Sequence, residues 1–262
     1  MGSKLGSRIR VEREGRALRI VLVRPEQGNA IDPEFVDELR AAAFQLDGNI
    51  GCLAIVAEGK TFCVGGDVRV FAEAAEPGPS VHAWATGFHQ AVLALMASAV
   101  PIVVGVQGWA VGGGLSLALL GDVLVLGRSA RVRAAYTAIG LTPDGGMSWT
   151  LPRVVGASRA RDLILTNRAI SAAEAEAMGL ATRVVDDQEL RATVDRLAAE
   201  LADGATDALG AARDLVHGGW SRDFAEQLDE EAKAIAARAD SGQGREGVRA
   251  FVERRAPHYR RW

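Results

Sequence analysis

The chain has 262 residues, with 30 basic side chains against 33 acidic ones and a formal net charge of -3. Hydrophobic residues make up 48% and charged residues 24%, which excludes a disordered or collagen-like chain and fits one large domain of about 250 residues. The balanced charge gives no global field that would attract nucleic acid or an anionic membrane, so neither is expected as a partner.

The first predicted unit is a strand, a turn and a helix. Residues 17–23 form a β-branched apolar run typical of a strand, and residues 24–29, RPEQGN, are typical of a turn. A helix is predicted over residues 33–46, because Asp32 is a good N-cap and apolar residues recur at helical spacing.

The same order repeats twice more along the chain. An apolar strand over residues 52–57 leads through a glycine-containing loop to a helix that opens at Asp67. A strand over residues 102–106 then leads through a turn at 108–114 to a helix over residues 115–120. Strand, glycine turn and helix in series predict an α/β fold with mostly parallel strands.

From about residue 157 onward the pattern is helical. The stretch at 76–79, EPGP, which lies between the second and third of these units, is predicted to be a mobile loop. No low-complexity linker interrupts the chain. We therefore predict one domain, with a core over residues 1–200 and a helical region over 201–262 that caps the core or contacts a neighbouring subunit. The predicted helices span 158–165, 172–178, 188–201, 205–216, 224–237 and 245–254.

The hydropathy and the cysteines indicate a cytoplasmic protein. The longest apolar stretches, such as residues 110–120, are too short and too rich in glycine to cross a bilayer, and residues 1–7 lack the apolar run of a signal peptide. Cys52 and Cys63 lack the spacing of metal ligands, so both are expected to be reduced thiols, and no metal is expected.

Two nucleotide-binding patterns are excluded. The Gly59-Lys60-Thr61 sequence resembles the end of a phosphate-binding loop, but position 54 is alanine where that loop requires glycine. The glycines at 112–114 do not fit the dinucleotide fingerprint, since no glycine follows at the required spacing. Nucleotide hydrolysis and hydride transfer therefore lose their best support.

Two glycine turns remain, FCVGGDV at 62–68 and GWAVGGGLS at 108–116, each of which ends a strand and opens a helix. Such turns direct unpaired backbone amides outward at a helix N-terminus, and two converging turns can bind one oxyanion. The alternative is that the glycines only allow tight turns and close packing.

These turns, together with RPEQGNAI at 24–31 and IGLTPDGG at 139–146, resemble the crotonase (enoyl-CoA hydratase/isomerase) superfamily in order and spacing. The resemblance continues through residues 163–185 to REGVRAFVERRAP at 245–257. It implies a crotonase-type spiral of repeated strand-strand-helix units with a helical C-terminal layer. It also implies an acyl-CoA thioester as substrate, no cofactor beyond the coenzyme A of that substrate, and a homotrimer or dimer of trimers.

The resemblance also implies the residues of the site. The amides of Gly66 and Gly113 would form an oxyanion hole for the thioester carbonyl, and Arg254 would meet a phosphate of coenzyme A across a subunit boundary, for which arginine is well suited. A solvated basic surface is the alternative for Arg254. The remaining positions expected to contact the acyl-CoA are Arg24, Gln27, Asn29, Ala30, Val64, Asp67, Val68 and Trp109.

The sequence departs from the hydratases of the superfamily at both of their glutamates, where this chain has Ser116 and Tyr136. Neither side chain can act as a carboxylate base near neutral pH, so hydration by two glutamates is not expected. Asp144 is the carboxylate that remains, and superfamily members with an acidic residue here are often double-bond isomerases. In the alternative reading, Asp144 only forms a Pro-Asp-Gly turn or caps the next helix.

Three functions are thus compared. Enoyl-CoA isomerisation in fatty-acid or aromatic-acid degradation is the leading prediction. In the first alternative, Asp144 is the nucleophile of a hydrolase or dehalogenase and His89 is the base, as in related aryl-CoA dehalogenases, although a lone helical histidine is usually a packing or surface residue. The second alternative is a hydratase-like or non-catalytic protein that binds acyl-CoA.

Overall fold

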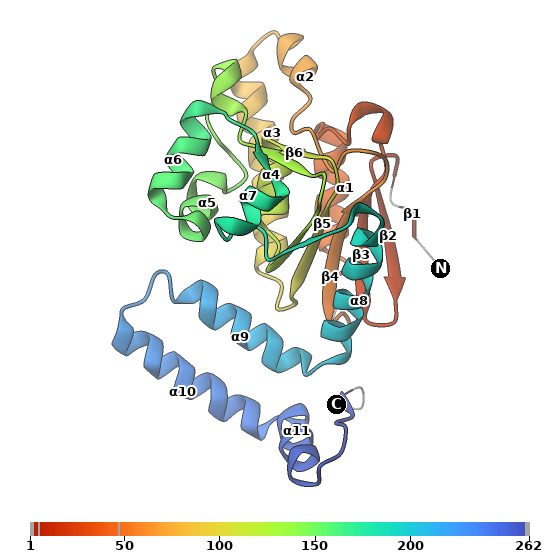
Figure 1. Cartoon of the computed structure of the whole chain (residues 1–262), viewed down its shortest axis with the longest axis vertical. Helices are drawn as coiled ribbons and strands as arrows, with labels where there is room; N and C mark the ends of the chain where they lie inside the picture. Colours follow the sequence, from red (N-terminus) through yellow and green to blue (C-terminus); the bar gives the residue numbers. More distant parts are fainter. Residues whose placement is uncertain (1–2, 5, 47, 260–262) are drawn as a thin grey trace.

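A seven-stranded sheet lies at the centre of the computed structural model, which describes residues 3–4, 6–46 and 48–259 (Figure 1). Within this sheet the strands from β3 onward pair in parallel, and β1, β2 and β3 form antiparallel pairs, so the predicted mostly parallel order is confirmed. In the order of the sheet, the strands are β1 (Ser3–Lys4), β2 (Ile9–Glu14), β3 (Ala17–Leu22), β4 (Cys52–Ala57), β5 (Ile102–Val106), β7 (Val123–Gly127) and β10 (Arg183–Val185).

A second sheet of three short strands stands beside the first. It contains β6 (Trp109–Val111), β8 (Arg131–Arg133) and β9 (Ile170–Ser171), in the order β6-β8-β9. Strand β6 lies inside the segment predicted to be a turn only. Three residues between glycines give too weak a pattern to predict a strand, and long-range pairing with β8 and with Cys63 stabilises it.

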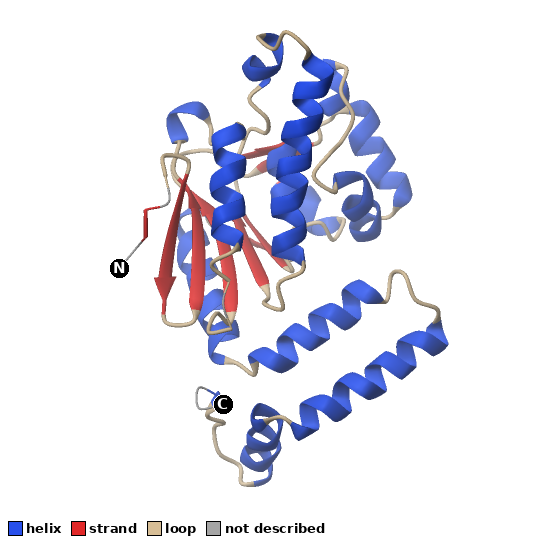
Figure 2. Ribbon diagram, turned by 180° about the vertical axis from the view of Figure 1, so that it is seen from behind, coloured by secondary structure: helices blue, strands red, loops and turns tan. Residues whose placement is uncertain are grey.

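Helices cover both faces of the large sheet (Figure 2). Helices α1 (Pro33–Ala43) and α3 (Pro77–Met96) bury apolar side chains in the larger core, and α8 (Leu190–Asp203) packs on β4 and β5 in a second core. The Asp32 side chain accepts a hydrogen bond of 2.8 Å from the amide of Phe35, which confirms the predicted N-cap. Helix α1 ends at Ala43, three residues before the predicted end.

The predicted loop at residues 76–79 is wrong, because α3 begins at Pro77. Amides in the first turn of a helix have no acceptor within the helix, so the missing amide hydrogen of proline costs nothing there. Pro77 and Pro79 are therefore compatible with a helical start. The shorter helices are α2 (Val68–Ala72), α4 (Gly113–Ala118), α5 (Met147–Val155), α6 (Ala157–Thr166) and α7 (Ala172–Ala177), with 3-10 helices η1 (Pro25–Gln27), η2 (Tyr136–Ile139) and η3 (Asp187–Glu189).

The C-terminal helices project from the α/β part, at the end opposite α2 (Figure 1). They are α9 (Thr206–Gly218), α10 (Phe224–Asp240) and α11 (Gly242–Val252), and α10 has no buried residue along its whole length. The division of the chain at residue 200 remains a prediction, and α8 runs across it to Asp203.

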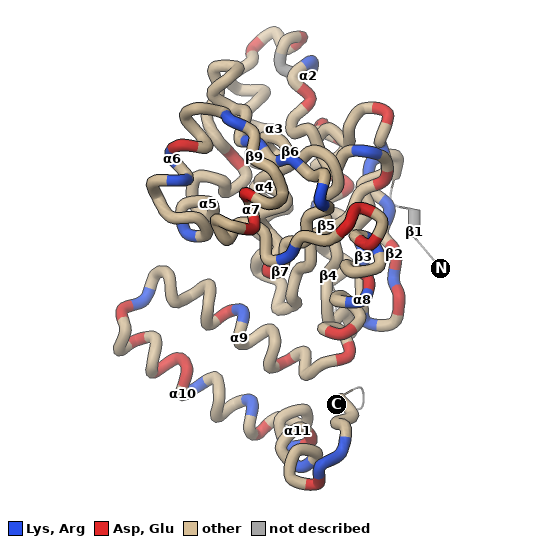
Figure 3. Tube along the Cα trace, viewed as in Figure 1, with Lys and Arg blue, Asp and Glu red and all other residues tan. Residues whose placement is uncertain are grey.

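Charges of both signs are interspersed over the surface, as along β2, β3 and α8 (Figure 3). Arg19, for example, forms ion pairs with Glu12 at 2.7 Å and with Asp195 at 2.7 Å. None of the helices that the structure describes has the length and apolar character needed to cross a membrane. Both cysteines are free and buried, as expected from the sequence.

Candidate active site

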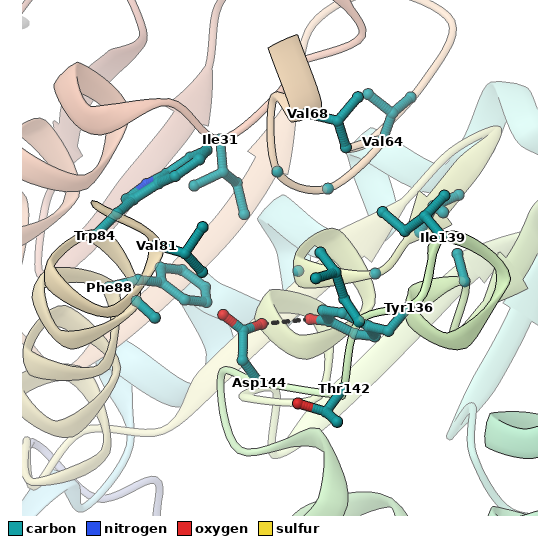
Figure 4. A pocket seen from close by; sticks show the side chains of 18 residues that line it. Ile31, Val64, Val68, Val81, Trp84, Phe88, Tyr136, Ile139, Thr142 and Asp144 are labelled. Carbon is teal, nitrogen blue, oxygen red and sulfur yellow. Dashed lines mark hydrogen bonds between the residues drawn. The ribbon is translucent and has the colours of Figure 1, made fainter. Parts of the chain in front are cut away.

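An apolar pocket of about 270 Å³ opens between α3, the two glycine turns and the segment after η2 (Figure 4). Trp84 and Phe88 project from α3 on one side, and Tyr136 and Ile139 from η2 lie on the other. The other hydrophobic side chains that line it are Ile31, Val64, Val68, Val81, Ala85, Val111, Ala135 and Leu141. The pocket suits a hydrophobic group with a few polar contacts at its base.

The two glycine turns pack directly against each other, and two glycines allow this close approach. Gly65 has φ +93°, and a side chain there would meet the carbonyl oxygen of Val111 at 2.7 Å. A side chain at Gly114 would meet the carbonyl oxygen of Cys63 at 2.3 Å. The packing role of the glycines is therefore real for Gly65 and Gly114.

The amides of Gly66 and Gly113 both border the pocket, and neither donates a hydrogen bond to any part of the chain that the structure describes. Gly113 is the first residue of α4, where a helix has no internal acceptor for the amide. A methyl group placed on Gly113 would lie 3.9 Å from the Gly66 nitrogen, so the two donors are close neighbours. This geometry suits the binding of one oxyanion by two amides.

Asp144 lies across the pocket from these turns and is held by Tyr136 (Figure 4). The Tyr136 hydroxyl donates a hydrogen bond of 2.5 Å to Oδ1 of Asp144. The N-cap of the following helix α5 is Gly146, and no side chain caps that helix. The reading of Asp144 as a helix cap is therefore wrong, because its carboxylate faces the pocket and contacts Tyr136 instead.

Ser116 and Tyr136, which occupy the positions of the hydratase glutamates, contact each other and Asp144. The buried Ser116 hydroxyl donates to the backbone oxygen of Asp144 at 2.8 Å and lies 3.2 Å from the Tyr136 hydroxyl oxygen. Burial and the neighbouring Asp144 carboxylate raise the pKa of the Tyr136 phenol, so this hydroxyl stays protonated and remains a donor near neutral pH.

His89 is near Asp144 but does not line the pocket. Its Nε2 lies 3.9 Å from Oδ2 of Asp144 and accepts a hydrogen bond of 3.1 Å from the amide of Gly145. A ring nitrogen that accepts this bond carries no proton, and its lone pair is occupied. The structure therefore places the two side chains together without giving His89 a free lone pair for a base.

The turn at residues 24–31 adjoins the pocket, because the amide of Val64 donates to the carbonyl of Gly28 at 3.0 Å. Its side chains, however, are used within the protein. The Asn29 side chain is 1% exposed, accepts from the Arg24 amide at 2.9 Å and donates to the carbonyl of Thr61 at 2.9 Å. The Asn29 side chain therefore holds two loops together, and a contact of this residue with the acyl-CoA stays a prediction.

The other predicted ligand residues fall into two groups. Val64 and Val68 line the pocket, whereas Arg24 pairs with Asp32, and both Gln27 and Asp67 hydrogen-bond to Arg69. Ala30 is buried and Trp109 is exposed on β6, and neither borders the pocket.

Arg254 follows α11, at the end of the molecule away from the pocket (Figure 1). Its side chain is exposed and does not line the pocket of its own chain. That role for Arg254 stays a prediction.

The arrangement of the side chains that shape the pocket does not follow from the sequence. Trp84 and Phe88 lie in the segment expected to begin as a loop, and their spacing of four residues on α3 is the signal that places both on one helix face. The Ser116–Tyr136 contact joins positions 20 residues apart and has no local signal.

Fold and pocket together define a crotonase-type α/β protein with paired glycine amides beside an apolar cavity. The profile of the enoyl-CoA hydratase/isomerase family matches residues 12–261. The chain belongs to this family, as the sequence motifs predicted.

Some similar proteins are named hydratases and others isomerases. A Rhodobacter capsulatus protein named "probable enoyl-CoA hydratase" is 36% identical over 94% of this chain and 95% of its own length. The 1,2-epoxyphenylacetyl-CoA isomerase of Escherichia coli is 33% identical over 94% of this chain and 95% of its own length. The crystal structure of an enoyl-CoA hydratase from Polaromonas sp. JS666 superposes with a TM-score of 0.91 at 30% identity, covering 95% of this chain and 98% of that one.

Proposed function

We propose that this protein is an enoyl-CoA isomerase that moves a carbon-carbon double bond within an acyl-CoA thioester. The observation that supports this function best is that Asp144 carries the one carboxylate among the described residues that line the pocket. A single carboxylate can move a proton between two carbons, whereas the hydratases use two glutamates to handle the added water.

The proposed reaction uses the two sides of the pocket in turn. Asp144 takes a proton from the carbon next to the thioester carbonyl, and the amides of Gly66 and Gly113 bind the enolate oxygen that results. The same carboxylate then returns the proton two carbons further along the chain. No atom is gained or lost, and the double bond becomes conjugated with the carbonyl.

The acyl group is hydrophobic, because the walls of the pocket are apolar on both sides. Trp84 and Phe88 suit either a fatty chain or a ring-derived acyl group, and the similarity to an isomerase of 1,2-epoxyphenylacetyl-CoA favours testing ring-derived thioesters alongside straight chains. Asp144 as a nucleophile assisted by His89 is less well supported, because the His89 Nε2 already accepts from Gly145.

Water addition distinguishes the proposed isomerase from a hydratase, the activity that the names of many relatives carry. We expect crotonyl-CoA to be hydrated at least about 10²-fold more slowly than a 3-enoyl-CoA is isomerised, because no second carboxylate activates water. Mass spectrometry of the products measures this directly, since isomerisation leaves the mass unchanged and hydration adds one water. Rapid hydration of crotonyl-CoA would contradict the proposal.

We also propose that the C-terminal helices contact other copies of the chain in a homotrimer or dimer of trimers. Large apolar side chains are exposed along α10 and α11: Phe224 at 78%, Ile235 at 73% and Phe251 at 85%. Exposed apolar side chains along a helix that buries none of its own residues, as in α10, are typical of a contact surface.

The assembly can be tested by sedimentation. We expect a mass of three or six times 27.6 kDa for the wild type and a shift toward the monomer when Ile235 and Phe251 are both replaced by aspartate. Lys233→Ala, an exposed substitution on the same helix, should leave the mass unchanged. A monomeric wild type would exclude the assembly.

A further inference from the structure

The carboxylate of Asp144 has two oxygens in different surroundings. Oδ1 accepts the 2.5 Å hydrogen bond from Tyr136, and the other oxygen points away from Tyr136, on the side of Phe88 (Figure 4). The nearest nitrogen of His89 is 3.9 Å from that second oxygen, beyond hydrogen-bond distance. Oδ2 accepts no hydrogen bond from the residues that the structure describes, so it is the more available oxygen for a proton from a bound acyl chain.

The hydroxyls of Ser116 and Tyr136 each carry one proton, and both protons have an acceptor on Asp144. Ser116 donates to its backbone oxygen at 2.8 Å, and Tyr136 donates to its Oδ1. The residue is thus held through its main chain by one hydroxyl and through its carboxylate by the other.

Tyr136 also lies beside the paired amides. A methyl group on Gly113 would be 3.9 Å from the Tyr136 hydroxyl oxygen and 3.9 Å from the Gly66 nitrogen. The hydroxyl therefore stands between the oxyanion donors and the carboxylate. This position fixes the direction of Asp144 relative to the place where the thioester carbonyl binds.

We infer that Tyr136 is a positioning residue for the isomerisation, which occupies Oδ1 of Asp144 and leaves Oδ2 as the oxygen that carries the proton from one carbon to the other. The inference rests on the proposed isomerase function and adds a role to the position where hydratases have a glutamate. A misplaced carboxylate would lower kcat without weakening substrate binding, because an error of about 1 Å in the placement of a reacting group can lower the rate about 10²-fold.

Tyr136→Phe removes the hydroxyl and keeps the ring against the pocket wall. With a 3-enoyl-CoA substrate, we expect kcat to fall about 10-fold to 100-fold, the loss typical of a hydrogen bond to a charged group, while KM changes less than about 2-fold. In an Asp144→Asn background the same substitution should have no further effect, because the two residues act through one contact.

The pH profile of kcat distinguishes positioning from a structural role. The ionisable side chains that face Asp144 are Tyr136 from η2 and His89 from α3, so the profile is measured in a His89→Gln background, where glutamine can still accept from Gly145. Loss of the phenol donor destabilises the ionised carboxylate, so the acid limb should move to higher pH in Tyr136→Phe.

A second measurement strengthens the phenol at position 136 as a hydrogen-bond donor instead of removing it. It does not depend on the Tyr136→Phe variant. Tyrosine occurs only twice in the chain, so fluorotyrosine incorporated into a Tyr259→Phe protein alters position 136 alone. Fluorotyrosine is a more acidic phenol and a stronger donor, and it should move the acid limb to lower pH. Thr137→Val is the matched control, because it removes a hydroxyl of η2 that bonds to Ile164 and not to Asp144.

The outcomes separate the inference from the proposed function. A wild type that isomerises, with both shifts of the acid limb and an unchanged Thr137→Val, supports both. A wild type that isomerises, with Tyr136→Phe matching its kcat and pH profile, overturns the inference and leaves the function standing. A wild type that isomerises no 3-enoyl-CoA overturns the function, and the inference with it.

Discussion

Asp144→Asn should lower the rate of 3-enoyl-CoA isomerisation by about 10² to 10⁴, the usual contribution of a positioned acid or base. Asparagine is nearly isosteric and its oxygen can still accept from Tyr136, but an amide cannot take up the substrate proton. The fold should be unaffected, because the Asp144 side chain caps no helix. Thermal unfolding and calorimetry with an unreactive acyl-CoA analogue check that folding and binding are retained.

A matched control for Asp144→Asn exists on α6. Asp162 is an accessible aspartate that pairs with Arg168 at 2.7 Å, outside the pocket lining, so Asp162→Asn should isomerise at the wild-type rate. An Asp144→Asn protein that also isomerises at the wild-type rate would remove Asp144 from the chemistry. A covalent acyl adduct on Asp144, seen by mass spectrometry of the wild type, would instead support the nucleophilic alternative.

The strands of the core were predictable because they are local apolar runs. Residues 52–57 and 102–106 were placed at their observed bounds, since a buried parallel strand reads as a continuous apolar run between turns. The two-residue strand β9 was not predictable, because Ile170 and Ser171 form a strand only by pairing with β8, some 40 positions earlier. Pairing of this kind is set by the tertiary fold.

The backbone part of the site was also predictable, unlike its side-chain contacts. The motifs identify Gly66 and Gly113, because the position of an amide in a turn follows from the backbone alone. The hydrogen bond between Tyr136, at the start of η2, and Asp144, which follows η2, depends on the rotamers of both side chains. Sequence spacing does not determine these rotamers.

The structural role of the Asn29 side chain was not predictable either. The motif that contains it resembles a ligand-binding turn, but its side chain has a structural use that depends on where β4 ends. Its amide donates to the carbonyl oxygens of Glu58 and Thr61, in the loop that follows β4. Those acceptors are about 30 residues away in the sequence, so their proximity to Asn29 emerges only once β3 and β4 pair.

Gly113→Pro should lower isomerisation by about 10² to 10³, the cost of removing one oxyanion donor. Gly113 is the first residue of α4, a position where proline is tolerated because the helix makes no use of that amide hydrogen. The preceding Gly112 lacks a side chain that would clash with the proline ring. The substitution therefore removes the Gly113 amide hydrogen, which the helix does not use but which the proposed reaction requires.

Gly113→Ala is the control that separates the donor from the shape of the turn. Alanine keeps the amide, and its methyl group would lie 3.0 Å from Cδ1 of Ile31, the end of a side chain that can shift by a few tenths of an ångström. We expect the alanine protein to retain most of its turnover and the proline protein to lose it, with similar thermal unfolding. If the two variants fold and turn over at the same rate, then the Gly113 amide does not bind the enolate oxygen, and stabilisation of that oxygen must come from Gly66 and other donors.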